Sequence, residues 1–118
     1  MTPTTPDNRA PSIEPASLSR YFRALGDPTR LRIITVLLEG ERTVSDLVDI
    51  LGVPQSRVSN HLACLKWCRF VTAEQRGRSV IYRLADDEVG NLLHLAASLA
   101  EPNGDHLMSC SRIGPEWT

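Results

Sequence analysis

The sequence predicts a small α+β fold that is mainly helical. Apolar residues recur at helical spacing through most of residues 14–70 and again after residue 86, whereas they alternate with polar residues between 71 and 84. A chain of 118 residues is long enough for one domain with a modest core, and such chains often complete that core by dimerising. We therefore expect helices around one short β-hairpin in a homodimer.

Three segments of the chain differ in composition. Residues 1–13 combine three prolines with small polar residues and are expected to form a disordered N-terminal arm. Residues 14–101 carry the periodic patterns and are expected to form the folded domain. Residues 102–118 then form a C-terminal tail, which contains one of the three cysteines, Cys110.

Two helices are expected to open the folded domain. The first begins near residue 14 and ends at Gly26. Asp27 suits the N-cap of a second helix, and Pro28 suits its first turn. Apolar residues cover most of the circumference of this second helix, so it should be the central core helix, ending near Gly40.

The next two helices have the pattern of a helix-turn-helix. Thr43–Asp46 has the T-x-x-D form of a capping box, which begins a short helix. Gly52–Pro54 interrupts that helix, and Pro54–Phe70 forms a longer one whose first turns are polar. Trp67, near the end of the longer helix, is expected to pack in the core.

A β-hairpin is expected after this helix. Val71–Gln75 and Ser79–Leu84 read as strands, joined by Arg76–Arg78, where a central glycine can supply the positive φ of a tight turn. A helix-turn-helix followed by a two-stranded β wing is a winged helix-turn-helix. The last helix begins with the acids of residues 86–88 and is too apolar to stay exposed, so the N- and C-terminal helices are expected to form the homodimer interface.

Charge is distributed unevenly along the chain. The net charge is −1, yet residues 54–83 contain six basic residues and a single acid. Such a segment is either a chance cluster of solvated charges or a face that binds a polyanion, and an exposed helix fits the major groove of double-stranded DNA. The candidate DNA contacts are the polar residues at the start of the second helix of the motif and the wing arginines: Gln55, Ser56, Arg57, Ser59, Asn60, His61, Arg76 and Arg78.

Two cysteines near the end of the same helix suggest a metal site. Cys64 and Cys68 are four residues apart, so they share a helical face with Cβ atoms ~5–6 Å apart, whereas a disulfide wants ~3.5–4.5 Å. Cys110 could add a third thiolate, and three soft sulfurs favour Cd(II), Pb(II) or Hg(II). Zn(II) would want a fourth ligand, which His61, His106 or water could supply. The alternative is that the helical pair are two buried, small apolar residues.

Four stretches together resemble the ArsR/SmtB family of winged-helix metal-sensing repressors. They are A-L-G-D-P-T-R-L-R-I (24–33), V-S-D-L (44–47), Q-S-R-V-S-N-H-L (55–62) and G-R-S-V-I-Y-R-L (77–84). The resemblance covers about residues 18–100. It implies a transcriptional repressor, not an enzyme, that binds operator DNA as a dimer and is released by a metal ion.

Within this family, the cysteines are similar to those of the CmtR type, which senses cadmium and lead. The similarity lies in C-L-K-W-C (64–68) together with a cysteine in the tail. It implies Cd(II) or Pb(II) as the inducer, and a Cys110 that reaches the cysteines of the other subunit. Two other metal sites of the family are not matched. Thr43 and Ser45 stand where arsenic sensors carry cysteines. The last helix has acids at residues 86–88 but only one histidine, His94, where zinc and cobalt sensors have paired Asp/His and His/Glu ligands.

Other functions are also compatible with parts of the sequence. The same thiols could serve a DNA-binding redox sensor, or the chain could be a winged-helix regulator that does not respond to metal. A thiol enzyme is disfavoured because no triad ordering, phosphate-binding loop or H-E-x-x-H motif is present. The sequence shows neither a signal peptide nor an apolar run near the ~18 residues of a membrane span, so a cytoplasmic location is expected.

Overall fold

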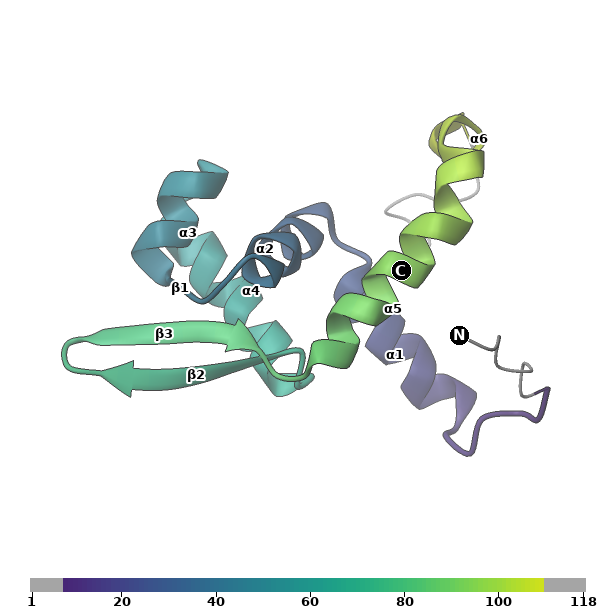
Figure 1. Ribbon diagram of the computed structural model, residues 1–118, viewed down its shortest axis with the longest axis horizontal. Helices are drawn as coiled ribbons and strands as arrows, with labels where there is room; N and C mark the ends of the chain where they lie inside the picture. The colour runs from purple at the N-terminus through teal and green to yellow at the C-terminus, as the bar shows by residue number, and fades with distance from the viewer. Residues whose placement is uncertain (1–7, 110–118) are drawn as a thin grey trace, which may run out of the picture.

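The computed structural model describes residues 8–109, and it consists of a group of helices with a small antiparallel sheet at one edge (Figure 1). The elements in order are α1 (Pro15–Leu25), α2 (Pro28–Leu38), β1 (Arg42–Thr43), α3 (Val44–Leu51), α4 (Gln55–Trp67), β2 (Val71–Arg76), β3 (Ser79–Leu84), α5 (Asp87–Ala100), a 3-10 turn (Glu101–Asn103) and α6 (Gly104–Ser109). The β2–β3 hairpin projects to one side of the molecule, and α5 and α6 extend to the other (Figure 1). No helix within residues 8–109 is long and apolar enough to cross a membrane.

The first two helices begin and end as predicted. α1 has Pro15 in its first turn, and Gly26 is its C-cap. The Asp27 carboxylate caps α2 by accepting a hydrogen bond from the backbone N–H of Arg30 at 2.9 Å. α2 ends at Leu38, shortly before Gly40, whose φ of 152° favours glycine.

The capping box of α3 is confirmed. The Thr43 hydroxyl accepts from the backbone N–H of Asp46, and the Asp46 carboxylate accepts from the backbone N–H of Thr43, each at 3.0 Å. Gly52 then adopts a left-handed conformation and ends the helix. Pro54 is the N-cap of α4 and not its first residue, so α4 begins one residue later than expected.

The C-terminus of α4 closes in a Schellman motif. The N–H of Phe70 donates to the carbonyl of Leu65 at 2.9 Å, and the N–H of Arg69 donates to that of Lys66 at 3.0 Å. Arg69 adopts the left-handed conformation of this motif, with φ of 65°, and it is the only non-glycine residue at positive φ within the described residues. This closure fixes Cys68 as the C-cap of α4.

The sheet has one strand more than predicted. The hairpin of β2 and β3 is confirmed, with Arg76 paired to Ser79 and the turn therefore reduced to Gly77 and Arg78. The additional strand, β1, pairs antiparallel with β3 and gives the order β1-β3-β2. It forms because the extended residues leading into the capping box of α3 lie along β3.

The core is formed mainly by α2, α3, α4 and the start of β2. Its largest fully buried side chains are Ile33, Ile34, Leu47, Val58, Leu62, Leu65, Phe70 and Val71. The prediction that Trp67 packs in this core is wrong, because its side chain is 86% exposed. Trp67 lies two positions after the buried Leu65, which places it about 200° round the helix, on the opposite side.

The outer helices expose large apolar side chains. Phe22 on α1 is 53% exposed, and Leu95 and Leu99 on α5 are 60% and 69% exposed. His94 is also exposed within this single chain. α5 ends at Ala100, and the short helix α6 forms within the stretch that was expected to be a tail.

Candidate nucleic-acid interface and thiol site

The start of α4 presents a polar face to solvent. Val58, Leu62 and Leu65 bury the inner face of this helix. Five of the six candidate DNA contacts on the helix are exposed: Gln55, Ser56, Arg57, Ser59 and Asn60. Their side chains offer the hydrogen-bond donors and acceptors that read base edges and bind phosphates.

His61 differs from the other candidates. Its side chain is only 20% exposed, and its Nε2 lies 3.9 Å from Oδ2 of Asp27 at the start of α2. The imidazole therefore packs between α4 and α2, and of the six candidates on α4 it has the least freedom to reach a base.

The two wing arginines are in different environments. Nη1 and Nη2 of Arg76 donate to the Glu41 carboxylate at 2.6 and 3.2 Å, and Nη2 also donates to Glu74 at 2.9 Å. These hydrogen bonds, first the one to Glu41 and then the one to Glu74, raise the pKa of Arg76. Arg78 is exposed at the hairpin turn, and no ion pair of its side chain occurs within the described part of the chain. Arg78 is therefore the wing cation that is free to meet a phosphate.

Cys64 and Cys68 lie one helical turn apart and are both partly buried. The backbone N–H of Cys68 donates to the carbonyl of Cys64 at 3.0 Å, so the helical spacing continues to the end of α4. Burial, and then the neighbouring Cys64 thiol, raise the pKa of the Cys68 thiol, and the charge of Arg30 opposes this. Cys68 also lines a groove of about 580 Å³ between α1 and the start of α5, whose other walls include Tyr21 and Asp86.

Arg30 is a neighbour of the thiols that the sequence patterns did not reveal. Its Nη1 donates to Sγ of Cys64 at 3.4 Å, and its Nη2 donates to the carbonyl of Arg23 at 3.5 Å. Its Nε is buried without a hydrogen-bond partner. Arg30 and Cys64 are 34 positions apart in sequence, so only the packing of α2 on α4 brings them together.

The described residues do not supply a complete metal site. Within residues 8–109, no three His, Cys, Asp or Glu side chains gather closely enough to hold an ion. Cys110, the predicted third ligand, lies outside the described residues. His106 is exposed on α6. As the described residues are arranged, none of them gives Cys64 and Cys68 a third protein ligand.

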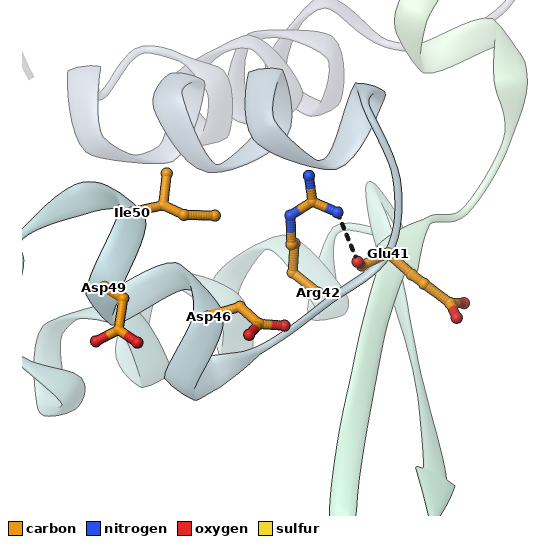
Figure 2. Close-up of a pocket in the computed structure, with 5 residues that line it drawn as sticks. All are labelled: Glu41, Arg42, Asp46, Asp49 and Ile50. Atoms are coloured by element: carbon orange, nitrogen blue, oxygen red, sulfur yellow. Dashed lines mark hydrogen bonds between the residues drawn. The ribbon is translucent and has the colours of Figure 1, made fainter.

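A separate acidic pocket is not an alternative metal site. Glu41, Asp46 and Asp49 line a pocket of about 350 Å³ together with Arg42 and Ile50 (Figure 2). The Asp46 carboxylate is used in the capping box of α3, and the Glu41 carboxylate is paired with an arginine of the wing. Nη1 of Arg42 also reaches into this region, where it donates to the Glu41 carbonyl at 2.9 Å (Figure 2).

A polar-faced helix in a helix-turn-helix, with a β-hairpin beside it, defines a winged-helix DNA-binding protein. Residues 27–73 match the model of the bacterial regulatory protein, arsR family. Over 106 residues the chain is 42% identical to the probable mercury resistance operon repressor of Streptomyces lividans, covering 90% of this chain and 85% of that one. The chain belongs to the ArsR family.

A second relative matches over a shorter region. Over 86 residues the chain is 46% identical to the HTH-type transcriptional regulator CmtR of Mycobacterium tuberculosis (strain ATCC 25618 / H37Rv), covering 73% of this chain and 68% of that one. The resemblance drawn from the sequence is thus confirmed at the level of the ArsR/SmtB family, whose members are transcriptional repressors and not enzymes.

Solved structures confirm the predicted winged helix-turn-helix. The crystal structure of M. tuberculosis Rv0081 has a TM-score of 0.71 at 30% identity, covering 80% of this chain and 99% of that one. The solution structure of a homodimeric winged helix-turn-helix DNA-binding domain, Mb0332 from Mycobacterium bovis, has a TM-score of 0.68 at 30% identity. The match covers 79% of this chain and 90% of that one. The predicted fold class is therefore correct.

Proposed function

We propose that this repressor binds operator DNA as a homodimer and is released when a soft metal ion binds Cys64, Cys68 and Cys110. One observation carries the proposal. Two thiols lie one turn apart at the C-terminal end of α4, the helix whose N-terminal turns expose the polar DNA-reading face. An ion bound at one end of a rigid helix can therefore bias the other end.

The chemistry of the donors supports a soft ion. Thiolates select thiophilic metals over Mg(II), Ca(II) or Mn(II), and three of them suit Cd(II) or Pb(II). The described chain supplies two thiols on one face of α4, and Cys68 lines a groove that an additional ligand could enter. In this proposal residues 102–118 carry the third ligand, Cys110, and residues 14–101 form the DNA-binding and dimerisation domain.

Release follows from restraint of α4. A metal that joins the tail to the C-terminal end of α4 fixes or tilts the helix, or changes the spacing between the two α4 helices of the dimer. Coupling free energies between such sites are typically ~1–3 kcal/mol, or about 5–150-fold in affinity. A repressor of this kind acts on bacterial DNA, so its location is the cytoplasm.

Dimerisation is supported by the exposed apolar faces of the outer helices. Phe22, Leu95 and Leu99 are each more than half exposed in the single chain. Burying such side chains removes apolar surface from water, at roughly 25 cal/mol per Å². The related Mb0332 domain is described as homodimeric. Two copies of α4 would then face two half-sites of a palindromic operator.

Mercury is the second candidate inducer. The relative from S. lividans is described as a mercury resistance operon repressor, and Hg(II) is satisfied by two thiolates in a linear arrangement. Cys64 and Cys68 alone could therefore hold Hg(II) or an organomercurial. Thiol oxidation is a weaker alternative, because cysteines one turn apart on a regular helix are poorly placed for a disulfide.

A titration of metals against the protein–DNA complex tests the proposal. Cd(II), Pb(II), Hg(II) and Zn(II) are added to the full chain bound to its own promoter DNA, and release is followed by fluorescence anisotropy. Cd(II) or Pb(II) should release the wild type, while Cys64→Ser and Cys110→Ser should stay bound. Ser109→Ala serves as the control for a change beside the tail cysteine. If no metal releases the DNA, the sensing proposal fails while DNA binding stands.

A further inference from the structure

Arg30 places a positive charge against the thiol pair from a different helix. It belongs to the first turn of α2, and its guanidinium reaches α4, where Nη1 donates to Sγ of Cys64 at 3.4 Å. The same guanidinium is held in place by the Arg23 carbonyl, which accepts from Nη2 at 3.5 Å. The contact therefore joins the start of the core helix to the sulfur that would bind the ion.

Asp27 interacts with this guanidinium only through its charge, which helps to lower the pKa of the Asp27 carboxyl. Asp27 lies on the same turn, but its carboxylate accepts from the backbone N–H of Arg30 and not from the side chain. Within the described residues no ion pair is formed by Arg30, and its Nε is buried without an acceptor. A partly buried cation whose hydrogen bonds go to a sulfur and a carbonyl is available to balance an anion at that sulfur.

The two types of metal complex differ in charge. A divalent ion that displaces three thiol protons forms a complex with a net charge of −1 and releases three protons. Hg(II) that displaces two thiol protons forms a neutral complex and releases two protons. Near neutral pH, where ordinary thiols are protonated, a nearby cation therefore stabilises the first complex relative to the second.

We propose that Arg30 is the counter-charge of the metal–thiolate complex and sets the preference for three-thiolate ions such as Cd(II) and Pb(II) over two-thiolate Hg(II). This inference rests on the proposed metal site at Cys64, Cys68 and Cys110. Arg30 does not ligate the metal. It acts as a positioning and specificity residue through its hydrogen bond to the Cys64 sulfur, as partners of metal ligands do elsewhere.

The test compares affinities of the full-length protein for Cd(II) and Hg(II) at pH 7, measured by competition with chelators and followed by thiolate-to-metal absorption. Removing a hydrogen-bonding partner of a ligand typically lowers metal affinity 10–100-fold. We expect Arg30→Gln to lower Cd(II) affinity by about 10-fold or more and to change Hg(II) affinity by less than about 3-fold. Arg32→Gln is the matched control. It removes the same charge from the same helix, but its guanidinium donates to the Leu51 carbonyl, away from the thiols.

Arg30→Lys keeps the charge and loses the planar fork of donors. It should keep the Cd(II)-to-Hg(II) affinity ratio within about 3-fold of the wild type. If the glutamine variant does not fold, the lysine variant alone tests whether the positive charge sets this ratio. The inference is overturned if Arg30→Gln leaves Cd(II) affinity unchanged, if both affinities fall equally as a purely structural defect would cause, or if the lysine variant loses the preference. Failure of the wild type to bind either ion would overturn the proposed metal site itself, a distinct result.

Discussion

The carboxylate of Glu41 lies 2.6 Å from Nη1 of Arg76, so an acid from the loop before β1 holds an arginine of the wing. Both side chains are roughly half exposed, at 42% and 46%. Because Arg76 also contacts Glu74, its guanidinium is committed to two carboxylates in the absence of DNA. A phosphate would have to compete with them.

Replacing Glu41 should therefore strengthen DNA binding. In Glu41→Gln, Arg76 of each subunit loses its closest carboxylate and becomes available to a phosphate, so affinity should rise and the salt slope should steepen by up to about 2 per dimer. Anisotropy titrations between low and moderate salt measure both quantities. Arg78→Gln is the comparison, because loss of the free wing cation from both subunits should weaken binding and flatten the slope by about 2 per dimer. An unchanged slope in Glu41→Gln would show that Arg76 does not reach DNA.

Stability in acid should depend on Asp27. Burial tends to raise the pKa of this carboxyl, but the hydrogen bond from Arg30, the charges of His61 and Arg30 and the Thr29 N–H outweigh it, so the pKa is lowered. A carboxyl with a lowered pKa in the folded state stabilises the protein above its unfolded pKa of about 3.9. That stabilisation is lost as the pH falls through the lower, folded value.

Asp27→Asn keeps a capping acceptor but stays uncharged. The variant should be less stable than the wild type at pH 6, and the difference should shrink towards zero as the pH falls below about 4. Urea unfolding of both proteins between pH 3 and pH 7 measures this difference in the free energy of unfolding. Asp27→Ala removes the capping acceptor as well as the charge. It should therefore be less stable than Asp27→Asn by about 1 kcal/mol at every pH in this range. A constant difference for Asp27→Asn would contradict the electrostatic explanation.

Local signals in the sequence were reliable where one residue determines the backbone. Asp27 before Pro28 marked the start of α2, and the T-x-x-D pattern at Thr43 marked the start of α3. Each depends on hydrogen bonds between residues three positions apart, so no knowledge of the tertiary packing was needed.

Contacts between distant segments were not predictable in this way. Arg30 meets Cys64, and Glu41 meets Arg76, over separations of 34 and 35 residues. These pairs depend on how α2 lies on α4 and how the loop before β1 lies beside the hairpin. The prediction that Trp67 is buried was based on its residue type. Its exposure is instead determined by its angular position on α4, opposite the buried Leu65.

The apolar face of α5 should control assembly. Leu95 and Leu99 are exposed in the single chain, so Leu95→Glu with Leu99→Glu should leave the fold intact and prevent dimerisation. Sedimentation should then give the mass of one chain, and operator affinity should fall by about 100-fold or more because two-site binding is lost. Ile50→Glu is the control, because Ile50 is an apolar side chain on α3 that is 50% exposed. This variant should still sediment with the mass of the dimer. A double variant that stays dimeric would place the interface elsewhere.

Arg69 offers a test of the closure of α4 that is independent of metal and DNA. Its φ of 65° lies in the left-handed region, where a side chain is disfavoured by about 1 kcal/mol and glycine is not. Arg69→Gly should therefore increase the free energy of unfolding by about 0.5 kcal/mol, since relief of this conformation exceeds the entropy that glycine adds to the unfolded chain. Gly52→Ala, at φ of 67°, imposes the opposite change and should lower the free energy of unfolding by about 1 kcal/mol. Urea unfolding measures both variants. A destabilised Arg69→Gly would mean that the arginine side chain contributes contacts to the end of α4 that outweigh its backbone conformation.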